Sequence, residues 1–168
     1  MLTLLAVLVQ AVPSARLTHT EIWFDARATV ADFQGRATAA TGELVGGAGP
    51  ADARGWIEVR WADIDTKNGT RNRHMLQTVD AERFPVIRFD VTAVRPGADS
   101  VAGTLALHGV TRQVVWPVTV RLGTDSVTVA ADFPVDMREY GIKPPVKFLI
   151  ARMGAVVTVH VRLVFAKE

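Results

Sequence analysis

Length, composition and charge limit what this chain can be. It has 168 residues, 49% of them hydrophobic, which suits a single domain that buries about 70% of its unfolded surface. The 19 basic and 17 acidic residues leave a net charge of +2, and this balance argues against a nucleic-acid-binding surface, which needs clustered positive charge. Cysteine is absent, so disulfides, thiolate nucleophiles and cysteine metal sites are excluded.

The N-terminal segment has the character of an export signal. Residues 2–12 are apolar at all but two positions, a length that suits the core of a signal peptide and is too short to span a bilayer. The segment has no Lys or Arg, and the alternatives are a first β-strand or a start codon placed late. We predict a signal peptide over residues 1–15, cleaved near residues 11–15, and one domain over residues 16–168. The expected location is periplasmic or secreted, with no stable membrane insertion.

Short segments of alternating apolar and polar residues follow this leader. In residues 20–25, for example, Ile22 and Phe24 alternate with Glu21 and Asp25, which is typical of a half-buried β-strand. Clusters of glycine and polar residues separate such segments and predict turns. The predicted strands are 20–25, 57–61, 87–91, 101–107 and 127–133, and the predicted turns are 46–50, 108–109 and 122–125.

Two later segments, residues 114–120 and much of 155–165, are apolar on both faces. Such a strand needs a partner on each face, and in an antiparallel barrel one partner can be a hydrophobic lumen or its ligand. Pro117 predicts an edge, a bulge or a strand start at its position. An apolar outer surface over residues 156–165 would also make a homodimer reasonable.

Helix is credible only in the connector that precedes the strand at 87–91. Thr78 can cap a helix over residues 79–83, which would end before Phe84 and Pro85, and residues 71–77 allow another short turn. Many short strands with so little helix favour an all-β barrel or sandwich.

An ordered series of motifs adds a resemblance to one family. The motifs are Ile64-Asp65-Thr66, Arg71-Asn72-Arg73-His74, Phe84-Pro85, Ile87-Arg88-Phe89, Gly103-Thr104-Leu105, His108-Gly109-Val110-Thr111, Phe133, Arg138 and Tyr140-Gly141-Ile142. From about Arg16 to Ala166 the chain resembles the YceI-like polyisoprenoid-binding family. Asn72 stands where that family often has an acid, and His19-Thr20 stands near its usual His-Ser pair.

The resemblance implies a fold and a function. The expected fold is all-β, an extended eight-stranded antiparallel lipocalin-like β-barrel with one or two short helices. The expected function is that of an exported carrier or binder, not an enzyme, which holds a long isoprenoid chain in a hydrophobic tunnel.

Large apolar residues at alternating positions are candidates for the wall of such a tunnel. Burying a methylene group contributes about 0.8 kcal/mol, so a few isoprene units in a dry tunnel would suffice for tight binding. The alternative is that these side chains fill a solid core. The candidate lumen residues are Phe33, Trp61, Phe89, Leu105, Leu107, Trp116, Phe133 and Ile150.

Basic residues are candidates for a polar mouth of the tunnel. A diphosphate or quinone head group needs hydrogen-bond donors, and the planar guanidinium of arginine can bind two oxygens at once. Arg71, Arg73, His74 and Arg138 are the donors that we single out. The alternative is a solvated loop in which His74 or Arg138 anchors the connector to backbone carbonyls.

Other chemistry has little support in the sequence. His19, His74, His108 and His160 lack metal-ligand spacing, so no metal or cofactor is expected. His108, next to Gly109, favours a turn residue whose ring bonds to the backbone. The serines lack the glycine pattern of a nucleophile elbow. No catalytic residue is predicted. The rival functions are an enzyme that uses His and Arg at the barrel mouth on a lipid, and a filled barrel that serves as an interaction module.

Overall fold

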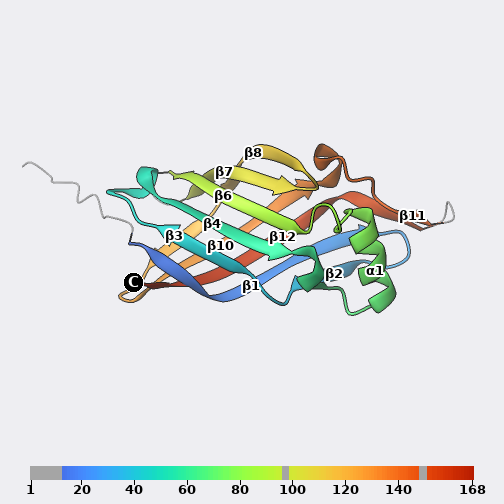
Figure 1. Ribbon diagram of the computed structural model, residues 1–168, viewed down its shortest axis with the longest axis horizontal. Helices are drawn as coiled ribbons and strands as arrows, with labels where there is room; N and C mark the ends of the chain where they lie inside the picture. The colour runs from blue at the N-terminus through green and yellow to red at the C-terminus, as the bar shows by residue number, and fades with distance from the viewer. Residues whose placement is uncertain (1–12, 96–98, 148–150) are drawn as a thin grey trace, which may run out of the picture.

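A single antiparallel sheet curls around a long axis in the computed structural model, which describes residues 13–95, 99–147 and 151–168 (Figure 1). One helix, α1 (Gly69–Thr78), lies at one end of the curled sheet together with β2 and β11. The strands are β1 (Ala15–Ala28), β2 (Phe33–Ala37), β3 (Thr41–Val45), β4 (Arg54–Arg60), β5 (Ile64–Asp65), β6 (Val86–Val94), β7 (Ser100–Leu107), β8 (Val110–Pro117), β9 (Thr119–Leu122), β10 (Ser126–Asp136), β11 (Val146–Lys147) and β12 (Ala151–Lys167). Three short 3-10 turns are η1 (Pro50–Asp52), η2 (Trp61–Asp63) and η3 (Met137–Tyr140).

The strand order confirms the all-β, lipocalin-like class and corrects the strand count. The order is β8-β7-β6-β4-β3-β1-β12-β10-β9, with β2, β5 and β11 beside this path. The described residues form twelve strands where we expected eight, and some are very short: β5 and β11 have two residues each. The apolar run 114–120, expected as one strand, is divided between β8 and β9.

The curled sheet has a seam between β8 and β10, because no backbone ladder joins these two strands in the described chain. Aromatic side chains close the seam instead. The ring of Trp116 on β8 stacks on the ring of Phe133 on β10, with centroids 3.7 Å apart and planes 13° apart. The ring of Phe89 on β6 lies 5.2 Å from that of Trp116. Pro117 ends the edge strand β8, which confirms its predicted edge position.

The helix lies in the predicted connector, over the residues 71–77 that allowed a short turn, but it does not extend over residues 79–83. The expected helix over residues 79–83 is wrong, because α1 ends at Thr78 and those residues form a turn. Asp80 takes a left-handed conformation, with φ of +49°, which a helix cannot continue. The true N-cap is Asn68, whose side chain accepts a hydrogen bond from the backbone N–H of Arg71 at 2.9 Å.

The turn between β7 and β8 is as predicted. His108 and Gly109 have φ values of +53° and +74°, as a two-residue hairpin turn between paired Leu107 and Val110 requires. The Nδ1 atom of His108 lies 2.8 Å from the carbonyl oxygen of the buried Tyr140. His108 therefore ties this hairpin to η3, on the far side of the seam.

The outer face of β12 is more polar than the sequence suggested. Val157, Leu163 and Phe165 are buried on the inner side, whereas Thr158, His160 and Arg162 alternate with the inward residues and lie on the outer face. Val156, which is 46% exposed, and Val164 lie on the same outer face, so the outer surface over residues 156–165 is mixed and not uniformly apolar as expected. The homodimer stays a prediction to which this face adds no support.

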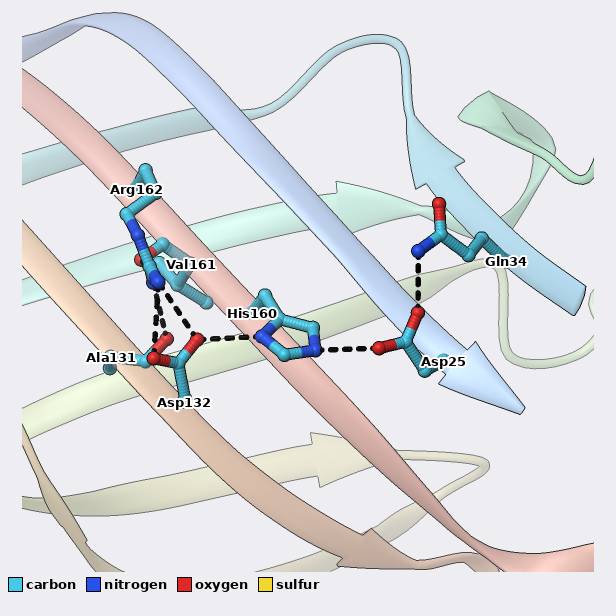
Figure 2. Close-up of polar contacts among 7 residues, drawn as sticks. All are labelled: Asp25, Gln34, Ala131, Asp132, His160, Val161 and Arg162. Atoms are coloured by element: carbon cyan, nitrogen blue, oxygen red, sulfur yellow. Dashed lines mark hydrogen bonds and ion pairs between the residues drawn. The ribbon is translucent and has the colours of Figure 1, made fainter. Parts of the chain in front are cut away.

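A polar network joins four strands, β2, β1, β12 and β10, on the outer face (Figure 2). His160 on β12 lies between two carboxylates, with Nδ1 2.6 Å from Asp132 on β10 and Nε2 2.9 Å from Asp25 on β1. Arg162 donates to Asp132 at 3.0 Å, and Gln34 donates to Asp25 at 2.7 Å. The network links the side chains of strands whose backbones are already paired.

This network predicts a pH-dependent part of the stability. Burial opposes the charge on His160, but the hydrogen bonds to Asp132 and Asp25 outweigh it and raise its pKa. The pKa values of Asp25 and Asp132 are lowered, mainly by the hydrogen bonds from Gln34 and His160 respectively. A raised histidine pKa stabilises the fold below the unfolded value of about 6.5, and the gain is lost as the pH rises through the folded value.

We therefore expect the free energy of unfolding, measured by urea denaturation, to decline as the pH rises above about 6.5. His160→Gln should remove most of that decline. His19→Gln is the matched control, because the side chain of His19 is 65% exposed and contacts only Glu21 weakly at 3.7 Å. A wild-type decline that survives in His160→Gln would assign the pH dependence to other groups.

Candidate ligand-binding cavity

The inward side chains of the curled sheet enclose a continuous cavity of about 1470 Å³. This exceeds the roughly 300–1,000 Å³ of typical small-molecule pockets. The interior is thus hollow, and the predicted lumen residues in the described chain line it: Phe33, Trp61, Phe89, Leu105, Leu107, Trp116 and Phe133. The remaining one, Ile150, lies outside the described residues.

The cavity is long and follows the strands. On β12 its lining extends from Met153 to Phe165, which at about 3.3 Å per residue is roughly 40 Å along the strand. Almost all of the lining side chains between its ends are aliphatic or aromatic. The shape and surface therefore suit one extended apolar chain.

Both ends of the cavity reach the surface, since exposed residues line it there. The α1 mouth is formed by Val30, Arg71, His74, Gln77 and Arg152. The η1 mouth, at the opposite end, is formed by Ala48, Ala51, Asp52, Arg54 and Leu122.

Helical spacing decides which residues of α1 face the cavity. Arg71, His74, Met75 and Thr78 lie three or four positions apart, and all line it. Arg73 falls outside this set, and its guanidinium donates to the Thr70 hydroxyl at 3.3 Å. The structure therefore places Arg71 and His74 in the predicted polar mouth and Arg73 outside it.

Arg71 is held in place by two contacts. Its guanidinium lies 4.2 Å from the centroid of the Phe33 ring and donates to the carbonyl oxygen of Thr66 at 3.3 Å. The cation is thus fixed at the mouth rather than free in solvent.

Asn72 anchors α1 to β5. Its side-chain oxygen accepts from the backbone N–H and the hydroxyl of the buried Thr66, at 2.9 and 2.7 Å. Its amide nitrogen donates to Asp65 at 3.0 Å, and this hydrogen bond is the largest of several that lower the pKa of Asp65. An amide can accept from Thr66 and donate to Asp65 at once, which a carboxylate in its place could not do.

Arg138 does not belong to the cavity. It lies in η3, where its guanidinium forms an ion pair with Asp136 at 2.6 Å, and the same carboxylate accepts from the Arg138 backbone N–H at 3.0 Å. The pair raises the pKa of Arg138 and lowers that of Asp136, in each case chiefly through the side-chain hydrogen bond. Asp136, two residues away, caps this turn and pairs with the Arg138 guanidinium, which we had expected at the mouth.

Two polar features of the site were missed by sequence reasoning. The indole Nε1 of Trp61 is buried in the cavity wall and has no hydrogen-bond partner in the described chain. An unpaired buried donor costs about 1–3 kcal/mol, which an acceptor oxygen in the cavity would relieve. Arg152 reaches the mouth because its carbonyl oxygen accepts from the backbone N–H of Thr29 at 2.9 Å, a contact between distant parts of the sequence.

The described residues show neither a metal site nor a membrane-spanning helix. The described residues contain no cluster of three or more His, Asp or Glu side chains placed to hold a metal ion. Their one helix is too short and too polar to cross a bilayer.

Solved structures share this architecture. BcnA of Burkholderia cenocepacia superposes with a TM-score of 0.74 at 17% identity, over 86% of this chain and 95% of that one. A polyisoprenoid binding domain from Saccharophagus degradans, implicated in plant cell wall breakdown, also gives 0.74, at 15% identity over 94% and 99%. The YCEI protein of Campylobacter jejuni gives 0.65 at 14% identity, over 80% and 84%. At these identities the likeness shows the fold.

Sequence comparison points the same way. A UPF0312 protein of Pseudomonas fluorescens is 38% identical over 80 residues, which are 42% of this chain and 40% of that protein. The sequence model of the YceI-like domain matches residues 14–165, nearly the whole chain. This protein therefore belongs to the YceI-like domain family.

Proposed function

We propose that this protein is an exported, non-enzymatic binding protein that holds a long-chain isoprenoid or a similar amphiphilic lipid, for transport, storage or sequestration. The observation that carries the proposal is the elongated, apolar cavity of about 1470 Å³ with a basic mouth. Further support comes from the Saccharophagus structure, which is described as a polyisoprenoid binding domain. Export rests on the apolar segment within residues 1–15.

The apolar wall supplies the affinity. Each buried methylene contributes about 0.8 kcal/mol, so a chain of several isoprene units gains far more than the cost of ordering it. Aromatic rings of Phe89, Trp116 and Phe133 and aliphatic side chains from β7 and β12 offer contacts that do not depend on a single chain length.

The donors at the α1 end suit an oxygen-bearing head group. Arg71, His74 and Arg152 line the mouth, and Trp61 adds an unpaired N–H in the wall. All four can donate to a carbonyl, hydroxyl or phosphate oxygen. A head group at this end would leave the η1 end to the tail.

Lipid extraction of the protein, purified from its host and analysed by mass spectrometry, tests the proposal. We expect a co-purifying isoprenoid in near-stoichiometric amount. Protein that emerges without lipid, and that takes up no long polyprenol when offered one, would reject the proposal. The rival enzyme predicts a different result, namely turnover of a lipid that is lost in His74→Ala while lipid binding is retained.

A substitution that narrows the cavity should weaken binding without unfolding the protein. Val159 lines the cavity midway along β12, so Val159→Trp places the added rings in empty space. We expect the dissociation constant for a long polyprenol to rise about tenfold or more, equivalent to about 1.4 kcal/mol. Titration with a fluorescent polyprenol measures it.

The matched control is Thr158→Trp, on the exposed outer face of the same strand. It should bind like the wild type, and both variants should keep the wild-type circular dichroism spectrum. Equal affinity of Val159→Trp and Thr158→Trp would mean that the ligand does not pass through the middle of the cavity.

A further inference from the structure

The two mouths of the cavity differ in charge. At the α1 mouth, Arg71, His74 and Arg152 line the opening, and no carboxylate from the described residues joins them in the lining. At the η1 mouth, Asp52 offsets Arg54, whose guanidinium also donates to the carbonyl oxygens of Ala51 and Ala53. Only the α1 mouth therefore presents a one-signed rim.

The α1 mouth also carries an exposed apolar side chain at its outermost turn. Val30 lies in the β1–β2 turn and is 77% exposed, more than any other large hydrophobic residue in the described chain. It packs into no core cluster, although it borders the cavity. Folding alone gives no reason for valine at this tip.

Backbone contacts set this apolar tip beside a cation. The N–H and hydroxyl of Thr29, next to Val30, donate to the carbonyl oxygen of Arg152 at 2.9 and 3.2 Å. Arg27 lies three residues before Val30 and is exposed. The exposed Asp32, two residues after Val30, accepts from the backbone N–H of Ala28 at 3.0 Å and offsets one of these positive charges. The tip thus combines one apolar side chain with an excess of arginines from β1 and β12.

We propose that the α1 mouth docks on an anionic lipid bilayer, with Val30 at the headgroup boundary and Arg27 and Arg152 against lipid phosphates. The proposal rests on the proposed function, because a lipid that leaves a membrane for the cavity avoids water only if the mouth meets the membrane surface. Basic side chains next to an anionic leaflet are attracted to it, and the attraction falls with salt. The η1 mouth also carries an exposed apolar residue, Leu122, but this side chain is 44% exposed against 77% for Val30, and this mouth lacks the excess of positive charge.

Co-sedimentation with vesicles tests the docking. We expect the protein to bind vesicles of equal parts phosphatidylcholine and phosphatidylglycerol, and not vesicles of phosphatidylcholine alone. High salt should weaken binding. One basic residue at an anionic surface accounts for about a fivefold change in affinity. Arg152→Glu removes one such residue and also reverses its charge, so it should lower the affinity for anionic vesicles about tenfold or more. Val30→Asp should give a loss of similar size.

Leu122→Asp is the matched control, since it makes the same kind of change at the opposite mouth and should bind vesicles like the wild type. Equal losses in Leu122→Asp and Val30→Asp, or equal binding to both kinds of vesicle, would overturn the proposal. Lipid extraction of the wild type and of the docking variants distinguishes a failure of the docking hypothesis from a failure of the proposed lipid binding. Arg27 does not line the cavity, so Arg27→Glu protein that retains its lipid but binds anionic vesicles about tenfold more weakly supports the docking. Lipid-bearing wild type that does not bind anionic vesicles refutes the docking and leaves the binding function intact.

Discussion

Replacing the half-buried Trp116 with alanine is expected to lower the free energy of unfolding by about 2–3 kcal/mol, less than the roughly 3–5 kcal/mol for truncation of a fully buried large aromatic residue. Trp116 stacks on Phe133 and contacts Phe89, and this stack spans the seam that no backbone ladder closes. The loss therefore combines the packing of one ring with the contact between β8 and β10. Urea denaturation followed by circular dichroism measures it, because tryptophan fluorescence changes with the substitution itself.

Two further variants test whether the loss of stability in Trp116→Ala comes from the seam. Trp116→Phe keeps a ring at the same position and should retain more than half of the stability that alanine loses. Trp56→Ala removes an indole from the outer face of β4, where Arg88 covers the ring at 4.7 Å, and should cost much less. A loss in Trp116→Ala no larger than that in Trp56→Ala would show that the aromatic stack does not hold the seam.

Removing the bound lipid is expected to lower the free energy of unfolding by about 3–4 kcal/mol, when the free lipid is present at 100 to 1,000 times its dissociation constant. Under the proposed function, the lipid binds the folded chain and not the unfolded one, because only the folded chain has the apolar cavity of about 1470 Å³. The protein is unfolded in guanidinium, extracted with organic solvent and refolded. Its melting temperature is then compared with that of the untreated protein.

Adding back a long polyprenol should restore the melting temperature, and a short-chain alcohol should not. The Val159→Trp variant should show a smaller recovery than Thr158→Trp. Delipidated protein that melts at the original temperature would mean that no ligand of the native state had been removed.

Alternation along the strands allowed much of the cavity wall to be predicted. A period of two places Leu105 and Leu107 on one face of their strand and made Phe133 a candidate for the wall, although the alternation alone does not say which face looks inward. The turn at His108 and Gly109 could also be predicted, because a two-residue hairpin turn needs positive φ at both positions and a pair that ends in glycine suits it.

The sequence did not allow us to predict the register of strands that are distant in the chain, nor the local ion pairs that occupy a charged side chain. Asp25 and His160 are 135 residues apart, and only the pairing of β1 with β12 brings them together. Arg138 was assigned to the mouth by its charge, but Asp136 is two residues away and holds it. The α1 boundary depended on the left-handed conformation of Asp80, which no periodicity reveals.

The seam between β8 and β10 is a line in the wall of the cavity that side chains hold together without a backbone ladder. The described contacts across it are made by side chains: the Trp116–Phe133 stack, the His108 ring on the Tyr140 carbonyl and the Arg112–Glu139 ion pair at 3.6 Å. Moving β8 away from β10 thus breaks no ladder hydrogen bond, whereas separation of any two paired strands breaks several. The girth of the barrel at this line is therefore set by side-chain contacts, above all the Trp116–Phe133 stack, and not by the spacing of hydrogen-bonded backbones.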